Sequence, residues 1–340
     1  MALNTEECSD SVRHSIVALL KPLHGGLRFG FKDIEVGSEE TLESLLQLFP
    51  KSKFVFLFRE PGSQFQSVQA QDYWDYSKSI VSFIEKYVNI DYNSVEKKIT
   101  AFIAEAVINS NLNGLVIGLS GGIDSSVVLE LACNTLPRHN ILGLIMPYDG
   151  ITPQNDIDDA LEMAKDKGID YRVITINSIH DSFMKNLADD KIASGNLNAR
   201  IRMSLLYYHA NLMNRLVIGT GDKSEIKLGY YTKYGDGGID LLPIGDLYKL
   251  QIRKLATHMK IKSEIINKKS SPQLWKDHSA ESEIGISYEL IDSILVCIEE
   301  SIDTKEICNI LNIEKKLVDK IILMIDNSNH KKILPKICEI

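Results

Sequence analysis

The sequence predicts an α/β fold in which a parallel sheet is flanked by helices. Short apolar runs rich in Val, Ile and Leu alternate with segments of helical periodicity, as expected for strands buried on both faces. Glycine-rich polar segments follow two of these runs, and ligands of such sheets collect at the carboxyl ends of the strands. The chain has 340 residues, 44% hydrophobic and 25% charged, and is long enough to bury the required core.

The spacing of apolar residues places the individual elements. Strands are expected at four short runs: 115–119, 141–146, 172–176 and 216–219. Helices are expected where apolar residues recur every three or four positions: 79–90, 94–110, 125–135, 154–167, 198–214 and most of the chain after 245. The pattern becomes regular near residue 81. We therefore expect one domain over 81–340 and a small α/β segment over 1–80.

The N-terminal segment differs from the rest. FVFLFREPGSQFQS at 54–67 predicts a strand followed by a loop and the start of a helix. With GFKDIE at 30–35, it resembles the 3′-phosphate-binding region of the sulfotransferases, which implies a nucleotide held by Arg59 and Ser67. A surface arginine and a helix cap are the alternative. The sulfotransferases also need an earlier glycine-rich phosphate loop with a lysine, and none precedes this segment. We therefore expect residues 1–80 to be a remnant of a sulfotransferase without its activity.

The sequence GLSGGIDSS at 118–126 is the strongest functional signal. It joins an expected strand to an expected helix, so backbone N–H groups and the helix N-terminus can hold an anion. Asp124 would repel a phosphate unless a divalent cation lay between them. A simple capped helix start is the alternative, and the Walker lysine is absent. The segment resembles the loop of the N-type ATP pyrophosphatases, which implies a Rossmann-like, adenine nucleotide alpha hydrolase-like fold and transfer of AMP from ATP.

A second polar segment, GTGDKSEIKLGYYTKYGDGGIDLLPIGDLYK at 219–249, follows the fourth expected strand. Its density of glycine, acid and base predicts a loop that closes over a ligand, although an exposed solvated loop is the alternative. Glu225 offers a second carboxylate for Mg²⁺, while Lys233 and Lys249 offer positive charge to phosphates. Upstream, Arg200 and Arg202 stand two positions apart on an expected helix, so only one of them is expected to face the site.

Taken together, GNLNARIRM, GTGDKSE, GYYTKYGDGGID, DLYK and residues 284–292 resemble the ammonia-dependent NAD⁺ synthetases over residues 81–340. The resemblance implies an ATP site at Gly118, Leu119, Ser120, Gly121, Gly122, Ile123, Asp124, Ser125, Thr220, Lys249 and Ser271. It implies a deamido-NAD⁺ site at Arg200, Lys233, Asp240, His330 and Lys331, and Mg²⁺ ligands at Asp124 and Glu225. Near Ser271 the order Ser270-Ser271-Pro272 departs from the Pro-Ser/Thr-Ala of the family.

The resemblance implies amidation of deamido-NAD⁺ by ammonia, with ATP converted to AMP and pyrophosphate through an acyl adenylate. Asp124, Glu225, Lys233 and Asp236 are the expected catalytic residues, and Asp236 is our candidate to take a proton from ammonium. The 80 leading residues are too few for the amidase domain of glutamine-dependent relatives, and Cys8 lacks a recognisable nucleophile setting. Free ammonia, or ammonia from a separate protein, is therefore expected. The resemblance also implies a homodimer.

Composition excludes other classes. A net charge of −8 argues against nonspecific nucleic-acid binding. The five scattered cysteines form no CxxC pair, which favours free thiols and a cytoplasmic location. No apolar run reaches membrane length. Three alternatives remain: an adenylating amidotransferase acting on a nucleotide base or a tRNA, a nucleotide-binding regulator without turnover, and an interaction module formed by residues 1–80.

Overall fold

The computed structural model describes residues 19–20, 29–30, 55–58, 66–69, 85, 87–271, 273–275, 279–333, 335 and 337–338. The chain divides into two compact units, residues 1–82 and 83–340. In the first unit two short antiparallel pairs are described: β1 (Leu19–Leu20) with β2 (Phe29–Gly30), and β3 (Val55–Phe58) with β4 (Gln66–Gln69).

The strand expected within 54–67 is confirmed, but the helix start expected after it is wrong. Ser67 lies in β4 opposite Leu57, and the four residues of β4 all pair with β3. Pairing between the two strands satisfies the backbone groups that a helix would otherwise have satisfied within itself. Arg59 lies outside the described residues, so its expected nucleotide contact stays a prediction.

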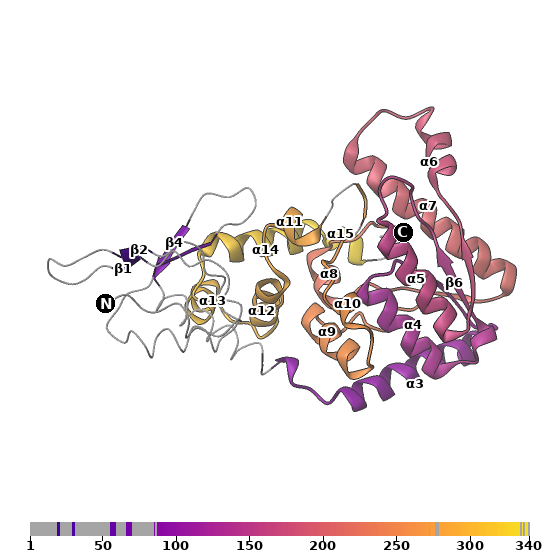
Figure 1. Cartoon of the computed structure of the whole chain (residues 1–340), viewed down its shortest axis with the longest axis horizontal. Helices are drawn as coiled ribbons and strands as arrows, with labels where there is room; N and C mark the ends of the chain where they lie inside the picture. The colour runs from indigo at the N-terminus through magenta and orange to yellow at the C-terminus, as the bar shows by residue number, and fades with distance from the viewer. Residues whose placement is uncertain are drawn as a thin grey trace. The chain divides into compact units, whose positions relative to one another are not determined.

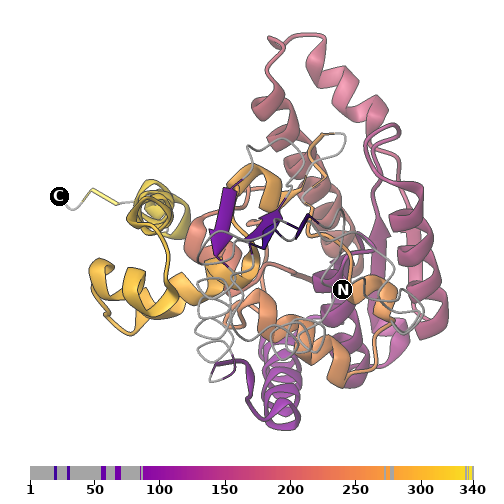
Figure 2. The same ribbon diagram turned by 60° about the vertical axis from the view of Figure 1, so that its left-hand side comes forward.

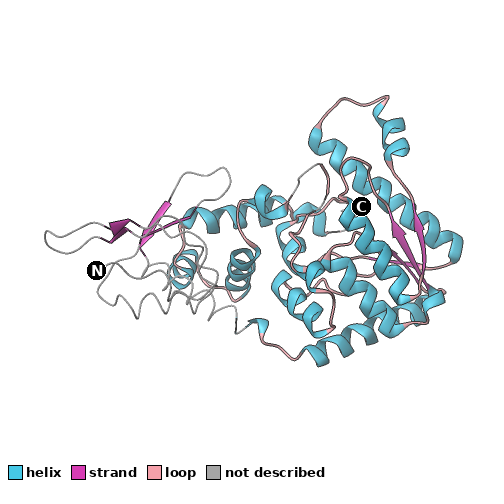
Figure 3. Cartoon of the chain, viewed as in Figure 1, coloured by secondary structure: helices cyan, strands magenta, loops and turns pink. Residues whose placement is uncertain are grey.

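The second unit contains a four-stranded parallel sheet, which confirms the expected fold (Figure 3). Its strands in spatial order are β7 (Asp170–Val173), β6 (Ile141–Ile145), β5 (Leu115–Gly118) and β8 (Leu216–Ile218). Leu115 pairs with Ile141 on one side and with Leu216 on the other. The expectation that every strand is buried on both faces is wrong for β7. This strand is exposed along its whole length because it forms an edge of the sheet.

Helices cover both faces of the sheet. On the face of Leu115 and Ile117 pack α3 (Tyr92–Ser110), α4 (Ile123–Thr135), α5 (Gln154–Lys167) and α9 (Lys249–His258). On the face of Val116 packs α7 (Lys191–Met213), preceded by α6 (Asn177–Met184). The alternation of Leu115, Val116 and Ile117 between two cores is the period of a strand with two buried faces. Figure 1 shows the sheet enclosed between these layers.

Local signals set the helix ends. The helix expected over 198–214 begins earlier, at Lys191, because the carboxylate of Asp190 accepts a hydrogen bond from Ala193 N at 2.7 Å and caps the helix. The same helix ends at Asn214, whose left-handed conformation closes the last turn. Figures 1 and 2 show α6 and the first turns of α7 extending beyond the sheet.

The remainder of the second unit is mostly helical, as expected. It comprises a 3₁₀ turn η1 (Arg138–Asn140), α8 (Lys223–Leu228), α10 (Ser263–Ile266), α11 (Ala280–Ile284), α12 (Tyr288–Glu299), α13 (Thr304–Leu311), α14 (Lys315–Asn327) and α15 (Asn329–Lys332). Across the part of the chain that the structure describes, no helix is both long enough and apolar enough to cross a bilayer. Because β5 and β8 are neighbours and end at Gly118 and Ile218, the polar segments that follow them meet at one edge of the sheet.

Candidate active site

The loop after β5 forms a tight turn into α4. Gly121 has a φ of +74°, and a Cβ on it would lie 2.1 Å from the carbonyl oxygen of Asp156. No other residue type fits there without strain. Ser120 Oγ accepts a hydrogen bond from Gly122 N at 3.2 Å, and Ser125 Oγ donates to the Gly122 carbonyl at 3.1 Å. The loop thus leads into the N-terminus of a 13-residue helix, an arrangement that favours anions.

A lysine that the sequence did not single out fixes this loop. Lys268 Nζ donates to the Gly121 carbonyl at 2.9 Å and to Asp156 Oδ1 at 2.6 Å, and it also pairs with Asp159. Gln273 Nε2 donates to the other carboxylate oxygen of Asp156 at 2.6 Å. We call residues 118–122 the phosphate loop, after the ligand expected from the sequence. Through Lys268 and Gln273, the carboxylate of Asp156 links this loop and α5 to the segment around residue 271.

At the centre of the site a fully buried lysine contacts three carboxylates. Lys249 Nζ lies 2.8 Å from Asp124 Oδ2, 2.7 Å from Asp222 Oδ2 and 3.4 Å from Glu225 Oε1. The Lys249 and Asp222 side chains have no exposed surface, whereas those of Asp124 and Glu225 are 22% and 23% exposed. The two outer carboxylates are thus available to a ligand, and the inner pair lies behind them.

The charges in this cluster stabilise one another. Burial alone would lower the pKa of Lys249, but the charges of Asp124, Asp222 and Glu225 raise it well above its usual value. Burial raises the pKa of Asp222, opposed by Lys249. Burial and the charge of Asp222 raise the pKa of Glu225 well above its usual value. The ammonium of Lys249 therefore stays charged and holds three acids together.

Asp222 was missed in the sequence although a local signal marks it. It caps α8: its carboxylate accepts from Glu225 N at 2.7 Å, while Glu225 Oε2 accepts from Asp222 N at 3.3 Å. The spacing D-x-x-E at 222–225 is that of a capping box, which predicts a helix start within a segment expected to be a loop. The cap positions Glu225 next to Lys249.

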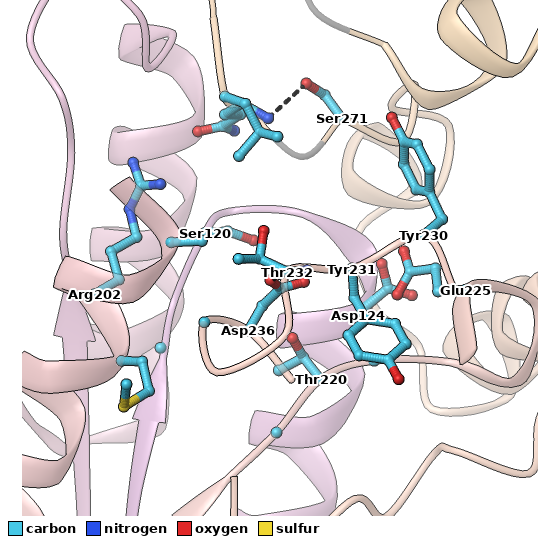
Figure 4. A pocket seen from close by; sticks show the side chains of 18 of the residues that line it. Ser120, Asp124, Arg202, Thr220, Glu225, Tyr230, Tyr231, Thr232, Asp236 and Ser271 are labelled. Atoms are coloured by element: carbon cyan, nitrogen blue, oxygen red, sulfur yellow. Dashed lines mark hydrogen bonds between the residues drawn. The ribbon is translucent and has the colours of Figure 1, made fainter. Parts of the chain in front are cut away.

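A pocket of about 400 Å³ opens over these groups. Figure 4 shows Ser120, Asp124, Thr220, Glu225 and Asp236 converging on it from separate segments. Of the residues expected from the sequence, the following line it: Gly118, Leu119, Ser120, Asp124, Thr220, Glu225, Asp236, Ser271 and Lys331. Side chains that were not assigned there also contribute: Tyr230, Tyr231, Thr232, Trp275, Tyr288 and Arg202. Tyr230, Tyr231 and Tyr288 lie in segments that carried the family resemblance, but no role was assigned to their side chains from the sequence.

The remaining expected residues lie around the pocket rather than on its lining. Gly121, Gly122, Ile123 and Ser125 shape the phosphate loop, and Lys249 is buried behind Asp124. Of the two arginines, Arg202 lines the pocket and its Nε donates to the Met146 carbonyl at 3.0 Å. Arg200 is exposed and donates to the Lys233 carbonyl at 3.4 Å. The structure brings Arg202 to the pocket, and the expected contact of Arg200 with substrate stays a prediction.

Asp240 has two hydrogen bonds within the protein. Its Oδ2 accepts from Val217 N and its Oδ1 from Tyr207 Oη, both at 2.8 Å. These bonds join the chain after the glycine-rich segment to β8 and α7. The geometry gives Asp240 a structural task, and its expected contact with deamido-NAD⁺ stays a prediction.

The short helix α15 is joined to the glycine-rich segment by two lysines. Lys331 Nζ donates to the carbonyls of Gly229 and Tyr231 at 2.7 and 2.8 Å. In return, Lys233 Nζ donates to the carbonyl of His330 at 2.6 Å. Residues a hundred positions apart therefore hold one rim of the pocket, while the expected contacts of His330 and Lys331 with deamido-NAD⁺ stay predictions.

Asp236 and Arg202 both line the pocket and interact electrostatically. Asp236 Oδ1 accepts from Thr232 N at 2.8 Å, and desolvation raises the pKa of Asp236 despite the nearby charge of Lys331. Desolvation lowers the pKa of Arg202 to about 10, with Asp236 opposing the shift. A carboxyl with a raised pKa is a better proton acceptor than an ordinary one.

The residues present suit Mg²⁺. This ion prefers oxygen ligands and is commonly held by one or two carboxylates together with substrate phosphates. Asp124 and Glu225 supply two such carboxylates beside the phosphate loop, and the ammonium of Lys249 already places one positive charge against both. Within the described residues no three His, Cys, Asp or Glu side chains form a cluster fit to hold a metal by themselves. The remaining ligands would come from the nucleotide and water.

Comparisons with known proteins agree with this geometry. The model of the NAD synthase family matches residues 95–335. An NH(3)-dependent NAD(+) synthetase from Staphylothermus marinus is 45% identical over 263 residues, which are 76% of this chain and 95% of that protein. One from Archaeoglobus fulgidus is 42% identical over 255 residues, 74% of this chain and 98% of that protein. The first unit lies before the family match, so its sulfotransferase resemblance stays a prediction.

Solved structures give the same result. The NH3-dependent NAD synthetase from Campylobacter jejuni superposes with a TM-score of 0.63 at 35% identity and covers 74% of this chain and 100% of that one. An NMN synthetase from Francisella tularensis has a TM-score of 0.66 at 31% identity, with the same coverage. The site from Gly118 to Lys331 lies wholly within the matched range. The chain belongs to the NAD synthase family.

Proposed function

We propose that this protein is an ammonia-dependent NAD⁺ synthetase, which amidates deamido-NAD⁺ with consumption of ATP. One observation supports the proposal above the others. A phosphate-type loop, two partly exposed carboxylates and a buried lysine meet at the pocket of a chain that belongs to the NAD synthase family. The first chemical step must activate a carboxylate, because oxide and hydroxide are poor leaving groups.

The nucleotide end of the site lies at the phosphate loop. We place the triphosphate against Ser120 and the N-terminus of α4, within reach of Thr220 and Ser271 on the pocket wall. Asp124 and Glu225 would hold Mg²⁺, which when bound offsets charge on the phosphates and on the departing pyrophosphate. Lys249 Nζ contacts both carboxylates and holds them close together before the nucleotide arrives.

The opposite end is proposed for the dinucleotide substrate. Lys331, Tyr231 and Arg202 also line the pocket and offer a cation, an aromatic face and a guanidinium. Contacts from Arg200, Lys233, Asp240 and His330 remain part of the proposal by resemblance, as does a role of Lys233 in stabilising charge during catalysis. The hydrogen bonds of Lys233 and Lys331 keep this rim ordered.

The reaction would proceed in two steps. A carboxylate oxygen of the nicotinate ring attacks the α-phosphorus of ATP, and the bond to pyrophosphate breaks with its electron pair. Ammonia then attacks the acyl carbon, and AMP departs with the electron pair of the acyl–oxygen bond. Asp236 would accept the proton that ammonium must lose, a task to which its raised pKa suits it. Enclosure by the glycine-rich segment would limit hydrolysis of the adenylate.

A second candidate differs in substrate size. The name of the F. tularensis protein suggests amidation of a mononucleotide, the smaller form of the same acid, by the same chemistry. We prefer the dinucleotide, because the more similar relatives bear the name NAD synthetase. Rates with the two substrates, compared under equal conditions, separate the candidates.

Assembly and location also remain proposals. We propose a homodimer, supported by the exposed edge strand β7 and by exposed apolar side chains on α6, on α7 and between them: Phe183, Leu187, Ile192, Tyr208 and Leu212. Among the described residues, Cys133, Cys297 and Cys308 are free thiols, which supports a reducing and therefore cytoplasmic location. Light scattering of the purified chain tests the dimer.

The decisive experiment supplies ATP, Mg²⁺, ammonium and deamido-NAD⁺ and follows AMP and NAD⁺ together. Formation of both in equal amounts is expected, and absence of NAD⁺ with the wild type rejects the function. Asp124→Ala and Glu225→Ala should each abolish pyrophosphate release. Asp246→Ala is a matched control, since this exposed acid lies outside the pocket. Normal rates in either of the first two variants reject the metal assignment.

A further inference from the structure

A buried carboxylate outside the pocket lining connects the two segments that carry the catalytic charges. Asp292, on α12, is 3% exposed and lies among the apolar residues of that helix. Its Oδ1 accepts a hydrogen bond from Ser224 Oγ at 2.5 Å, and its Oδ2 accepts from Leu250 N at 3.0 Å. A buried acid is costly unless such bonds stabilise it. Asp292 is the last residue of the segment 284–292, which contributes to the family resemblance, but the sequence assigned no role to its side chain.

Both partners of Asp292 are direct neighbours of charged site residues. Ser224 precedes Glu225 on α8, and Leu250 follows Lys249 at the start of α9. Ser224 Oγ also accepts from Lys249 N at 3.0 Å, which closes the network between the two helices. One carboxylate therefore binds the first turn of α8 through a hydroxyl and the first turn of α9 through a backbone N–H. Burial raises the pKa of Asp292 to about 7, in keeping with its enclosure.

We propose that Asp292 is a positioning residue for the adenylation step, which holds Glu225 and Lys249 at the separation that the nucleotide and its metal require. The proposal rests on the proposed function. Without Asp292, α8 and α9 would each lose a bond at the turn that carries the charged side chain. Placement errors well below the width of an atom are enough to slow a reaction that depends on aligned groups.

Four substitutions separate positioning from simple packing. Asp292→Ala removes both hydrogen bonds. Asp292→Asn retains the shape, and its amide can accept from Leu250 N while donating to Ser224 Oγ. The matched control is Glu289→Gln, because Glu289 on the same helix also binds α9, through Arg253 Nη1 at 2.8 Å, but touches neither Ser224 nor Leu250. Ser224→Ala gives an independent removal of one bond should Asp292→Ala fail to fold.

The affinity for ATP in the presence of Mg²⁺ is measured by titration, and KM and kcat are measured for both substrates. For Asp292→Ala and Ser224→Ala we expect at least about a tenfold loss in ATP affinity and in pyrophosphate release, with KM for deamido-NAD⁺ nearly unchanged. Asp292→Asn should keep most of the ATP affinity and pyrophosphate release that Asp292→Ala loses. In both quantities, Glu289→Gln should match the wild type within about twofold.

Unaltered ATP affinity in both Asp292→Ala and Ser224→Ala would overturn the proposal, as would an equal loss in Glu289→Gln. A loss confined to the yield of folded protein, with unchanged KM for ATP, would assign Asp292 to stability alone and equally overturn it. Wild-type protein that binds ATP but makes no NAD⁺ would reject the proposed function instead. In that case the ATP titrations of the variants still decide the role of Asp292.

Discussion

Replacing Lys249 by methionine tests whether the three carboxylates depend on one ammonium. Methionine is apolar and unbranched, so it suits the buried position of the lysine stem and removes only the charge and its hydrogen bonds. Asp124, Asp222 and Glu225 would then face one another without a cation. Removal of one partner from a buried ion pair costs about 3–5 kcal/mol, so we expect Lys249→Met to lower the free energy of unfolding by that amount near neutral pH.

The cost should depend on pH in a defined direction. The pKa values of Asp222 and Glu225 are raised already, and loss of Lys249 would raise them further. A carboxyl whose pKa is higher in the folded state contributes stability that is present at low pH and is lost as pH rises through that pKa. The deficit of Lys249→Met should therefore be largest above neutrality and shrink toward about pH 5, where neutral carboxyls no longer repel one another.

Urea unfolding followed by circular dichroism at several pH values measures the effect. Lys315→Met is the control, since its pair with Asp319 is exposed and contributes no more than about 0.5 kcal/mol. Adding Asp222→Asn to Lys249→Met should restore about 1–2 kcal/mol, because one buried charge is removed with its partner. A loss below about 1 kcal/mol in Lys249→Met, independent of pH, would refute this account of the cluster.

Three further predictions follow from single contacts. Gly121→Ala places a Cβ against the Asp156 carbonyl, so it should destabilise the chain by at least about 1 kcal/mol more than Gly150→Ala. Gly150 is the control because it has a φ of +88° and open space around it. Equal urea midpoints for the two variants would contradict this. Burial raises the pKa of Asp292 to about 7, so the wild type should lose stability relative to Asp292→Asn as pH rises toward 7. The difference in free energy of unfolding should grow by up to about 1.4 kcal/mol per pH unit and stay constant above about pH 7. A difference that does not change between about pH 5 and 8 would contradict this prediction. Asp236→Asn should slow aminolysis while pyrophosphate release persists, and unaltered amide formation in rapid-quench experiments would dismiss Asp236 as the proton acceptor.

Much of the fold could be predicted because the relevant signals are local. Branched apolar runs gave the four strands, and β7 alone began two residues before its expected run. Its sequence DYRV is half polar, so the strand pattern was weak where the edge meets solvent. The helix start expected near Ser67 failed for the opposite reason, because pairing with β3 outweighs any local preference.

The site could be predicted only in part, because its decisive contacts join distant residues. Lys249 contacts Asp124 across 125 positions, and no spacing rule links them. Arg200 and Arg202 are equal in sequence terms, and only the direction of α7 relative to the sheet separates the exposed one from the one at the pocket. Asp222 differs from these cases, because its capping spacing with Glu225 was present in the sequence and points to the helix that carries the site.

The hydrogen bonds of Lys233 and Lys331 to backbone carbonyls join segments that are synthesised at different times. In a growing chain, the residues of the sheet, the loop after β5 and the acidic cluster are all synthesised before residues 330 and 331. Until then the carbonyls of Gly229 and Tyr231 lack the ammonium that orders them. Chains that stop before residue 330 would therefore retain the loop after β5 but lack the contacts that hold this rim of the pocket.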